Sequence, residues 1–414
     1  MIEIVIHWLR LGGGIILALF FGNVSEALVE EYTLPQILVH RNAPIISVEE
    51  WEELRRPEIL ALFEKNVYGS IPKDKPMMSV EILEEGAAFD GVAYRKQVRV
   101  TLTRAGMVLP LQLLIYTPST VIEQNVRSPG FAQSEVGIER QGFPVVISYN
   151  LEGNHTIHTD EKIIPSKVYA KRIPGAFKDF NVRERGKRSE RLPVEQLVKE
   201  GYAVVTVYYG DVDPDYNDGF KNGAHALYPE LEAGSWGSIG AWAWGFSRVV
   251  DYVETEEVFD SDRVVIFGFS RLGKSALWAA ANDQRFGTVI VDSPGEGGAA
   301  LSKRNYGENI FLMTLRFPHW FVSAYRGFSG NEEELPVDQH MLLALVAPQS
   351  LLVSSSDKDY WSDFVGEKIA TEEAQVVYRL YDSSHLAHVL HKGRHEVTKD
   401  EWDDYLLFLK EAFQ

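Results

Sequence analysis

A continuous run in the second half of the chain joins an apolar segment to a glycine-containing turn: Val264-Val265-Ile266-Phe267-Gly268-Phe269-Ser270-Arg271-Leu272-Gly273-Lys274-Ser275. Short apolar runs bounded by glycine and rich in β-branched and aromatic residues are typical of buried parallel strands. A helix is expected to follow, from about Ser275 to Asn282. The run therefore predicts a strand, a tight turn and a helix, with Ser270 at the carboxyl end of the strand.

The alternation of apolar strands and helices continues on both sides of this run. Strands are expected at 143–148, 202–208, 288–291, 350–354 and 376–380, and helices at 236–253, 366–374 and 399–413. A helix at 47–68 and antiparallel strands at 80–83, 94–103 and 109–116 are expected before them. Repeated strand–helix–strand units form a parallel sheet with helices on both faces. The sequence therefore predicts an α/β fold, a three-layer sandwich whose mostly parallel sheet carries antiparallel N-terminal strands.

Two chemistries compete for the turn at Ser270. From Gly268 onward the residues match G-x-x-x-x-G-K-[ST], the loop that cradles phosphates in nucleotide hydrolases, and the match lies between a strand and a helix as that motif requires. From Ser270 onward they resemble a nucleophile elbow, which presents a serine hydroxyl on a strand-to-helix turn. In that interpretation Leu272 stands where the elbow usually has glycine, and Gly273 comes one residue later.

The position of the run in the chain favours the elbow. A phosphate loop usually follows the first strand of its domain, whereas several expected strands precede residue 264. Only the strand ending at Asp292 offers a carboxylate suited to a magnesium ion. In contrast, Ser270, Asp359 and His395 occur in the order serine, acid, histidine that α/β-hydrolases use. We therefore predict a serine hydrolase of the α/β-hydrolase type.

The predicted general base is His395. It lies in a turn just before the C-terminal helix, from which an imidazole can reach the strand ends. His385, His388 and His391 are close in sequence and compete for the role.

The acid that orients this histidine is expected from the end of a neighbouring strand. Asp357 and Asp359 follow the apolar strand at 350–354, and Asp292 ends the preceding strand. The residues alone leave these candidates open.

Several segments resemble the glucuronoyl esterases of carbohydrate esterase family 15, and the likeness covers about residues 34 to 412. The matching segments, all in family order, are Trp51 with Arg55-Arg56-Pro57-Glu58, Tyr68-Gly69, Asn154-His155-Thr156, Gly201-Tyr202-Ala203, Gly268 to Lys274, Gly297-Gly298-Ala299-Ala300-Leu301, Phe317-Pro318-His319-Trp320-Phe321, Leu335-Pro336-Val337-Asp338-Gln339-His340 and Gly393-Arg394-His395.

The resemblance implies hydrolysis of the ester between the 4-O-methyl-glucuronate groups of glucuronoxylan and the alcohols of lignin, without a metal or an organic cofactor. It implies Ser270 as nucleophile, His395 as base and Arg271 as a side chain that stabilises the oxyanion. The family match also implies that Lys274 and Glu308 bind sugar hydroxyls and that Trp361 forms a wall of the uronate pocket.

The chain departs from the commoner family pattern in the loop after residue 292. Many members have a glutamate where Ser293 stands, and a serine cannot act as the acid. Other members have an aspartate two residues before the tryptophan, which here is Asp359 before Trp361, so we assign the acid to Asp359 and keep Asp292 as the alternative. Pro294 and Glu296 also differ from the family pattern, which leaves open an acetyl-xylan or other carbohydrate esterase, or a catalytically silent carbohydrate-binding relative.

Composition and termini limit partners and location. The 414 residues carry a formal net charge of −18, which argues against nucleic acid and anionic membrane as partners. No cysteine is present, so disulfides and thiolate metal sites are excluded.

Residues 1–27 resemble a signal peptide with small residues before a cleavage site at Ala27. We therefore expect a secreted or periplasmic monomer with one catalytic domain at 28–414, and no membrane contact after signal removal. The long connections 162–191 and 213–234 are expected to frame its site.

Overall fold

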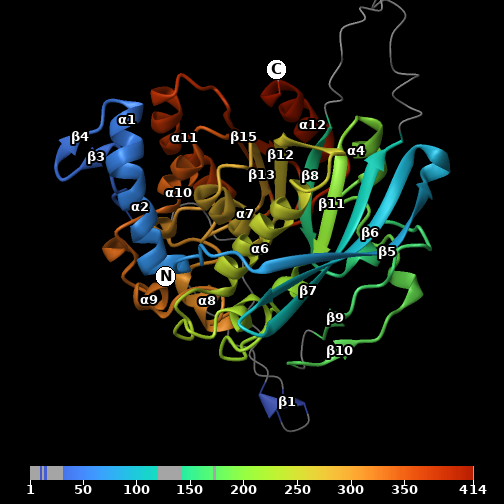
Figure 1. The fold of residues 1–414 in the computed structure, drawn as a ribbon. Coiled ribbons are helices and arrows are strands. Elements are labelled where there is room, and N and C mark those ends of the chain that lie inside the picture. The colour runs from blue at the N-terminus through green and yellow to red at the C-terminus, as the bar shows by residue number, and fades with distance from the viewer. Residues whose placement is uncertain (1–9, 12–13, 16–30, 120–141, 171–173, 414) are drawn as a thin grey trace, which may run out of the picture.

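The computed structural model describes residues 10–11, 14–15, 31–119, 142–170 and 174–413. Its centre is a nine-stranded sheet in the order β15-β14-β13-β12-β8-β11-β7-β6-β5 (Figure 1). The strands are β5 (Met77–Ala88), β6 (Ala93–Arg104), β7 (Met107–Pro118), β8 (Phe143–Asn150), β11 (Ala203–Tyr208), β12 (Phe259–Phe269), β13 (Thr288–Asp292), β14 (Ser350–Ser356) and β15 (Leu386–His391). Strands β8 and β11–β15 run parallel, and β5–β7 are antiparallel. The predicted α/β fold is confirmed.

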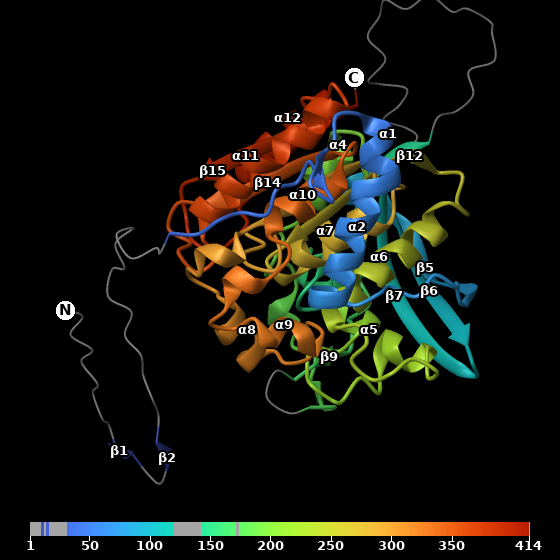
Figure 2. The same ribbon diagram turned by 90° about the vertical axis from the view of Figure 1, so that its left-hand side faces the viewer.

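Helices cover both faces of this sheet. They are α1 (Val48–Glu50), α2 (Arg56–Phe63), α4 (Val194–Lys199), α5 (Tyr209–Val212), α6 (Ser238–Val253), α7 (Arg271–Asn282), α8 (Ile310–Arg316), α9 (Ser323–Gly327), α10 (Gln339–Val346), α11 (Phe364–Leu380) and α12 (Glu401–Ala412). The π-helical turns η2 (Trp51–Arg55) and η3 (Glu64–Tyr68) join α1 and α2 into the helical segment expected at 47–68. Figure 2 looks onto this segment, which packs on α10.

Short elements complete the chain outside the main sheet. The 3₁₀ turns are η4 (Phe89–Gly91), η5 (Asn154–Thr156), η6 (Val182–Glu184), η7 (Gly223–Leu227), η8 (Ser302–Arg304) and η9 (Glu332–Glu334). Three two-residue strand pairs are β1 (Arg10–Leu11) with β2 (Gly14–Ile15), β3 (Val39–His40) with β4 (Ala43–Pro44), and β9 (Val168–Tyr169) with β10 (Phe177–Lys178). Apart from β1 and β2, the predicted signal peptide lies outside the described residues.

The apolar side chains of β12 belong to two separate hydrophobic cores. Val264 and Ile266 join the core under α6, α7, α10 and α11, whereas Val265 and Phe267 join the core under α4 and α12. Successive side chains of a strand point to opposite faces, so a strand covered on both sides must be apolar throughout. This double burial explains why the sequence is a continuous apolar run and shows no polar alternation.

One predicted strand is wrong. Residues 376–380 form the last turns of α11, and the edge strand is β15, ten residues later than the start of that prediction. The buried residues Ala370, Ala374 and Val377 recur at spacings of four and three, which is a helical pattern. A short apolar run at 376–380 does not distinguish strand from helix by itself.

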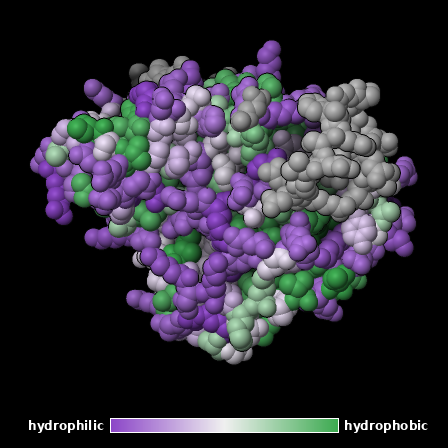
Figure 3. Space-filling model, turned by 45° about the horizontal axis from the view of Figure 1, so that its top comes forward, coloured by the Kyte–Doolittle hydropathy of each residue, from purple (hydrophilic) through white to green (hydrophobic). Residues whose placement is uncertain are grey.

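The face of the molecule drawn in Figure 3 is mainly polar. Figure 3 shows hydrophilic residues spread over the face it presents, with hydrophobic residues in separate patches. Within the part of the chain that the structure describes, no helix is long and apolar enough to cross a membrane.

Candidate active site

Ser270 lies in a sharp turn between β12 and α7. Its backbone has φ 58° and ψ −131°, and its N–H donates to the carbonyl of Asp292 at 2.9 Å. Strand and helix cross so closely that a Cβ on Gly268 would lie 2.4 Å from the carbonyl oxygen of Leu272. A Cβ on Gly273 would lie 3.0 Å from Pro294. The two glycines of the apparent phosphate motif are therefore explained by the close packing around this turn, which leaves little room for a side chain at either position.

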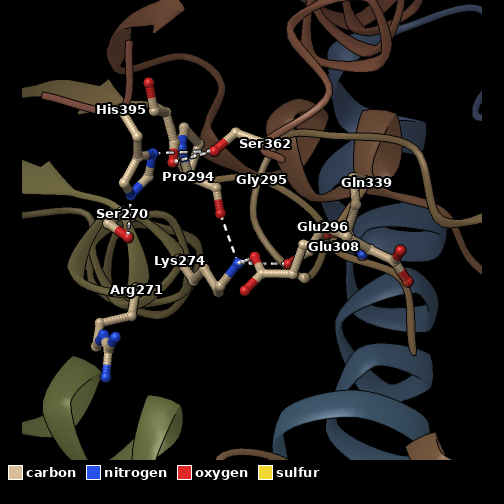
Figure 4. A network of polar contacts seen from close by, with 12 residues as sticks. Ser270, Arg271, Lys274, Pro294, Gly295, Glu296, Glu308, Gln339, Ser362 and His395 are labelled. Atoms are coloured by element: carbon tan, nitrogen blue, oxygen red, sulfur yellow. Dashed lines mark hydrogen bonds and ion pairs between the residues drawn. The ribbon is translucent and has the colours of Figure 1, made fainter. Parts of the chain in front are cut away.

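The side chain of Ser270 begins a chain of hydrogen bonds (Figure 4). Its Oγ lies 2.8 Å from Nε2 of His395, and Nδ1 of His395 lies 2.6 Å from Oδ2 of Asp359. The hydroxyl of Ser362 lies 3.2 Å from the same Nδ1. The structure thus brings the predicted nucleophile, base and acid together in the geometry that proton transfer requires.

Asp359 is held as a carboxylate. It is 3% exposed, and burial alone would raise its pKa. Hydrogen bonding to His395, the charge of that imidazole and the hydrogen bonds from Ser362 outweigh burial, so the pKa of Asp359 lies below its ordinary value. A carboxylate in this state stabilises the imidazolium that forms when His395 accepts a proton.

Asp292, the alternative acid, makes different contacts. Its Oδ2 accepts hydrogen bonds from the hydroxyls of Tyr405 at 2.6 Å and Ser354 at 2.8 Å. Its side chain is fully buried, and burial raises its pKa. The carboxylate hydrogen-bonded to His395 is therefore Asp359, and Asp292 contributes its backbone carbonyl to the turn at Ser270.

The competing histidines bond elsewhere. Nδ1 of His385 lies 3.2 Å from Ser350 Oγ, and Nε2 of His388 lies 3.0 Å from Ser355 Oγ. The third, His391, lies 3.7 Å from a carboxylate of α12. His395 packs on the ring of Phe269 with centroids 4.8 Å apart and stays partly exposed.

Lys274 and Glu308 form one ion pair. The ammonium group of Lys274 donates to Oε2 of Glu308 at 2.7 Å and to the carbonyls of Pro294 at 2.7 Å and Glu296 at 2.6 Å. All three donors are therefore in use, and Lys274 is 1% exposed. In this arrangement Lys274 fixes Glu308 and the loop after Asp292, and it is not available to the phosphates that a nucleotide-binding loop would hold.

Trp361 is joined to this ion pair by a backbone hydrogen bond. Its carbonyl accepts the N–H of Glu308 at 2.8 Å, and the guanidinium of Arg316 lies 5.4 Å from its ring centroid. The residues predicted to bind the sugar, Lys274, Glu308 and Trp361, are thus neighbours.

Arg271 points away from this group. Figure 4 shows Arg271 and Lys274 leaving the start of α7 in different directions. The guanidinium of Arg271 forms an ion pair with Asp215, a residue that the sequence did not single out. Asp215 lies in a connection with no motif, so the only sequence signal was the unusual length of 213–234.

A cleft of about 290 Å³ adjoins Arg271. Both long connections contribute to it, as expected from their length. Its lining is Leu151, Glu152, Tyr169, Ala170, Arg191, Tyr208, Tyr209, Asp215, Tyr216, Arg271 and Phe317. The cleft is therefore rich in aromatic side chains and is bounded by two arginines.

The sheet and the turn at Ser270 define a member of the α/β-hydrolase class. Residues 189–382 match the family model described as "Glucuronyl esterase, fungi". Carbohydrate esterase MZ0003 from an unknown prokaryotic organism is 36% identical over 411 residues, which cover 93% of this chain and 91% of that protein.

Solved structures agree with this class. A glucuronoyl esterase from Solibacter usitatus is 34% identical with a TM-score of 0.84, over 94% of this chain and all (100%) of that one. A promiscuous CE15 esterase from a marine bacterial metagenome is 35% identical with a TM-score of 0.81, over 94% of this chain and 99% of that one. The chain belongs to carbohydrate esterase family 15, the glucuronoyl esterase family, and is a carboxylic ester hydrolase.

Glu296, which departs from the family pattern, is a buried acid behind Lys274. It is 2% exposed, its Oε1 accepts the hydroxyl of Tyr325 at 3.2 Å, and its Oε2 has no partner. Burial, with the nearby carboxyl of Asp338 adding to it, raises the pKa of Glu296 well above its ordinary value. Glu296 is therefore held in its neutral, protonated form.

Glu296→Gln is expected to stabilise the fold at neutral pH. A carboxyl whose pKa is raised on folding keeps its full stability below the pKa of the unfolded chain, about 4.3, and loses it as pH rises toward the folded value. Glutamine has no proton to lose, so the variant should melt at a higher temperature than the wild type at pH 8 and show no gain at pH 4. Thermal unfolding by circular dichroism measures this difference, with the exposed Glu53→Gln as control. An equal loss of stability at both pH values would contradict a neutral Glu296.

Proposed function

We propose that the chain hydrolyses esters of 4-O-methyl-glucuronate, the esters that join glucuronoxylan to lignin alcohols. The observation that carries the proposal is the hydrogen-bonded chain Ser270–His395–Asp359 lying next to the Lys274–Glu308 ion pair. The first set of residues supplies acyl transfer, and in the second Lys274 holds the carboxylate of Glu308, which supplies a polar group for a sugar that carries the ester.

The proposed reaction has two steps. Ser270 attacks the uronate carbonyl while His395 takes the hydroxyl proton, and the C–O bond to the alcohol breaks as His395 returns that proton to the leaving oxygen. Water then attacks the acyl-enzyme with the same histidine as base, which releases the uronic acid and restores Ser270. We assign stabilisation of the carbonyl oxygen, where negative charge develops, to Arg271 and the N-terminus of α7.

The substrate groups are assigned to the two sides of Ser270. The uronate ring is proposed to lie against Glu308 and Trp361. Lys274 holds the carboxylate of Glu308, and the carbonyl of Trp361 accepts the N–H of Glu308. The alcohol is proposed to occupy the cleft beside Arg271, where Tyr169 and Tyr216 present aromatic rings. Aromatic side chains favour aromatic partners through offset and edge-to-face contacts, which supports an aryl-bearing alcohol.

A wider ester range is the second candidate. It is favoured by the similar marine metagenome protein, which is described as promiscuous. Acetyl groups on xylan are small and neutral and do not require the Lys274–Glu308 pair.

Purified protein is expected to release acid from benzyl glucuronate, and Ser270→Ala is expected to lose this activity by at least about 10³-fold while keeping its melting temperature. Acid release is measured by titration, with acetylated xylan assayed in parallel. Acetate release without uronate hydrolysis would support the wider esterase, and tight sugar binding without either reaction would support a silent binding protein.

The acid is tested by a matched pair of isosteric variants. Asp359→Asn is expected to lower kcat by about 10²- to 10⁴-fold, because the amide neither fixes the tautomer of His395 nor stabilises its imidazolium. Asp292→Asn, which keeps an acceptor for Tyr405 and Ser354, is expected to stay within about tenfold of the wild type. The reverse order of the two effects would make Asp292 the acid.

Tyr216→Ala is expected to weaken the use of aromatic esters selectively. Losing one ring contact of about 1 kcal/mol corresponds to about fivefold in KM for benzyl glucuronate, with no change for the methyl ester. Steady-state kinetics on both esters measure the ratio, and Tyr94→Ala, an exposed tyrosine on β6, is the control. An equal effect of Tyr216→Ala on both esters would show that the cleft does not hold the alcohol.

A further inference from the structure

Asp215 collects four donors at a single buried carboxylate. Its Oδ1 accepts the Nε2–H of His319 at 2.9 Å and the Nε1–H of Trp320 at 2.8 Å. Its Oδ2 accepts the hydroxyl of Tyr209 at 2.9 Å and forms the ion pair with Nη1 of Arg271. The Asp215 side chain is only 10% exposed. Burial would raise its pKa, but the charge of Arg271 and the hydrogen bonds from His319 and Trp320 lower it overall, so Asp215 is ionised.

The guanidinium of Arg271 contacts two aromatic rings as well as Asp215. It lies 4.6 Å from the ring centroid of Trp320 and 5.1 Å from that of Phe317. Those two rings stack with centroids 3.9 Å apart and planes 4° apart. Arginine rotates about many bonds, so three contacts of this kind remove most of its freedom before a substrate arrives.

Arg271 has donors that Asp215 does not use. Nη1 is held by Asp215, and neither Nε, which is enclosed by protein, nor Nη2 makes a hydrogen bond among the described residues. Since the protein encloses Nε while the side chain of Arg271 is 26% exposed, the unpaired donor that a substrate oxygen can reach is Nη2.

We propose that Asp215 is a positioning residue for ester hydrolysis: it holds Nη1 of Arg271 so that Nη2 of the guanidinium stays free for the oxyanion of the tetrahedral intermediate. The inference deepens the proposed function, since it concerns the same serine. It assigns a purpose to the long connection 213–234, which brings Asp215 to Arg271. Asp215 itself does not touch the substrate.

The test is a double-mutant cycle on full-length protein with p-nitrophenyl acetate, a substrate that needs the serine and the oxyanion site but no sugar contact. Asp215→Asn is expected to lower kcat about 10- to 100-fold with KM within twofold. Arg271→Gln is expected to lower kcat by at least as much, and the double variant is expected to be no slower than Arg271→Gln alone. Asp213→Asn is the matched control, because Asp213 lies in the same connection but bonds His225 and Ser238; its effect should multiply with that of Arg271→Gln.

The outcomes separate positioning from support of the fold. Multiplying effects of Asp215→Asn and Arg271→Gln, an unchanged kcat in either variant, or a lowered melting temperature with normal kcat would overturn the proposal. If Asp215→Asn does not fold, Trp320→Phe, which removes one donor to Asp215, takes its place, with an expected two- to tenfold loss of kcat that disappears in the Arg271→Gln background. Turnover of p-nitrophenyl acetate without turnover of glucuronate esters would refute the proposed substrate and leave this test intact.

Discussion

The backbone of Ser270 has a positive φ, and the site depends on keeping it there. A non-glycine residue in this region costs about 1–3 kcal/mol, so surrounding contacts must hold it. The close crossing of β12 and α7 at Gly268 and Gly273, together with the hydrogen bond to the carbonyl of Asp292, provides that restraint. The same turn points the hydroxyl toward His395, and Arg271 and Lys274 leave the start of α7 in different directions.

The parallel sheet then brings the other groups to one edge. Ser270 follows β12, Asp292 ends β13, Asp359 follows β14 and His395 follows β15, and the carboxyl ends of parallel strands meet at the same edge. Asp292, at the end of β13, is on the strand next to that of Ser270, but its carboxylate accepts a hydrogen bond from Tyr405 of α12. The acid that reaches His395 therefore comes from the next strand along.

Local pattern predicted much of this arrangement and failed where tertiary contacts decide. The turn at Ser270 and the buried strands could be predicted because double burial requires continuous apolar residues. The short apolar run at 376–380 is compatible with a strand as well as a helix, and its strand prediction is wrong because the residues continue α11. The strand β15 carries two histidines and lies at the sheet edge, so its sequence looks unlike the core strands.

The site shows the same division between motif and contact. Ser270 and His395 could be proposed from motif and order. The residues alone left Asp292 and Asp359 open, and the family resemblance favoured Asp359, whose side chain is the one hydrogen-bonded to His395. The burial of Lys274 by three acceptors and the clamp of Asp215 on Arg271 involve residues that are far apart in the chain, and no spacing rule connects them.

The most direct test of this account is covalent labelling of the nucleophile. Intact-protein mass spectrometry after treatment with a fluorophosphonate, followed by peptide mapping, reports which hydroxyl reacts. We expect one added group on Ser270, with labelling slowed at least about 10²-fold in His395→Ala. A label on another residue, or a rate on Ser270 that does not depend on His395, would contradict it.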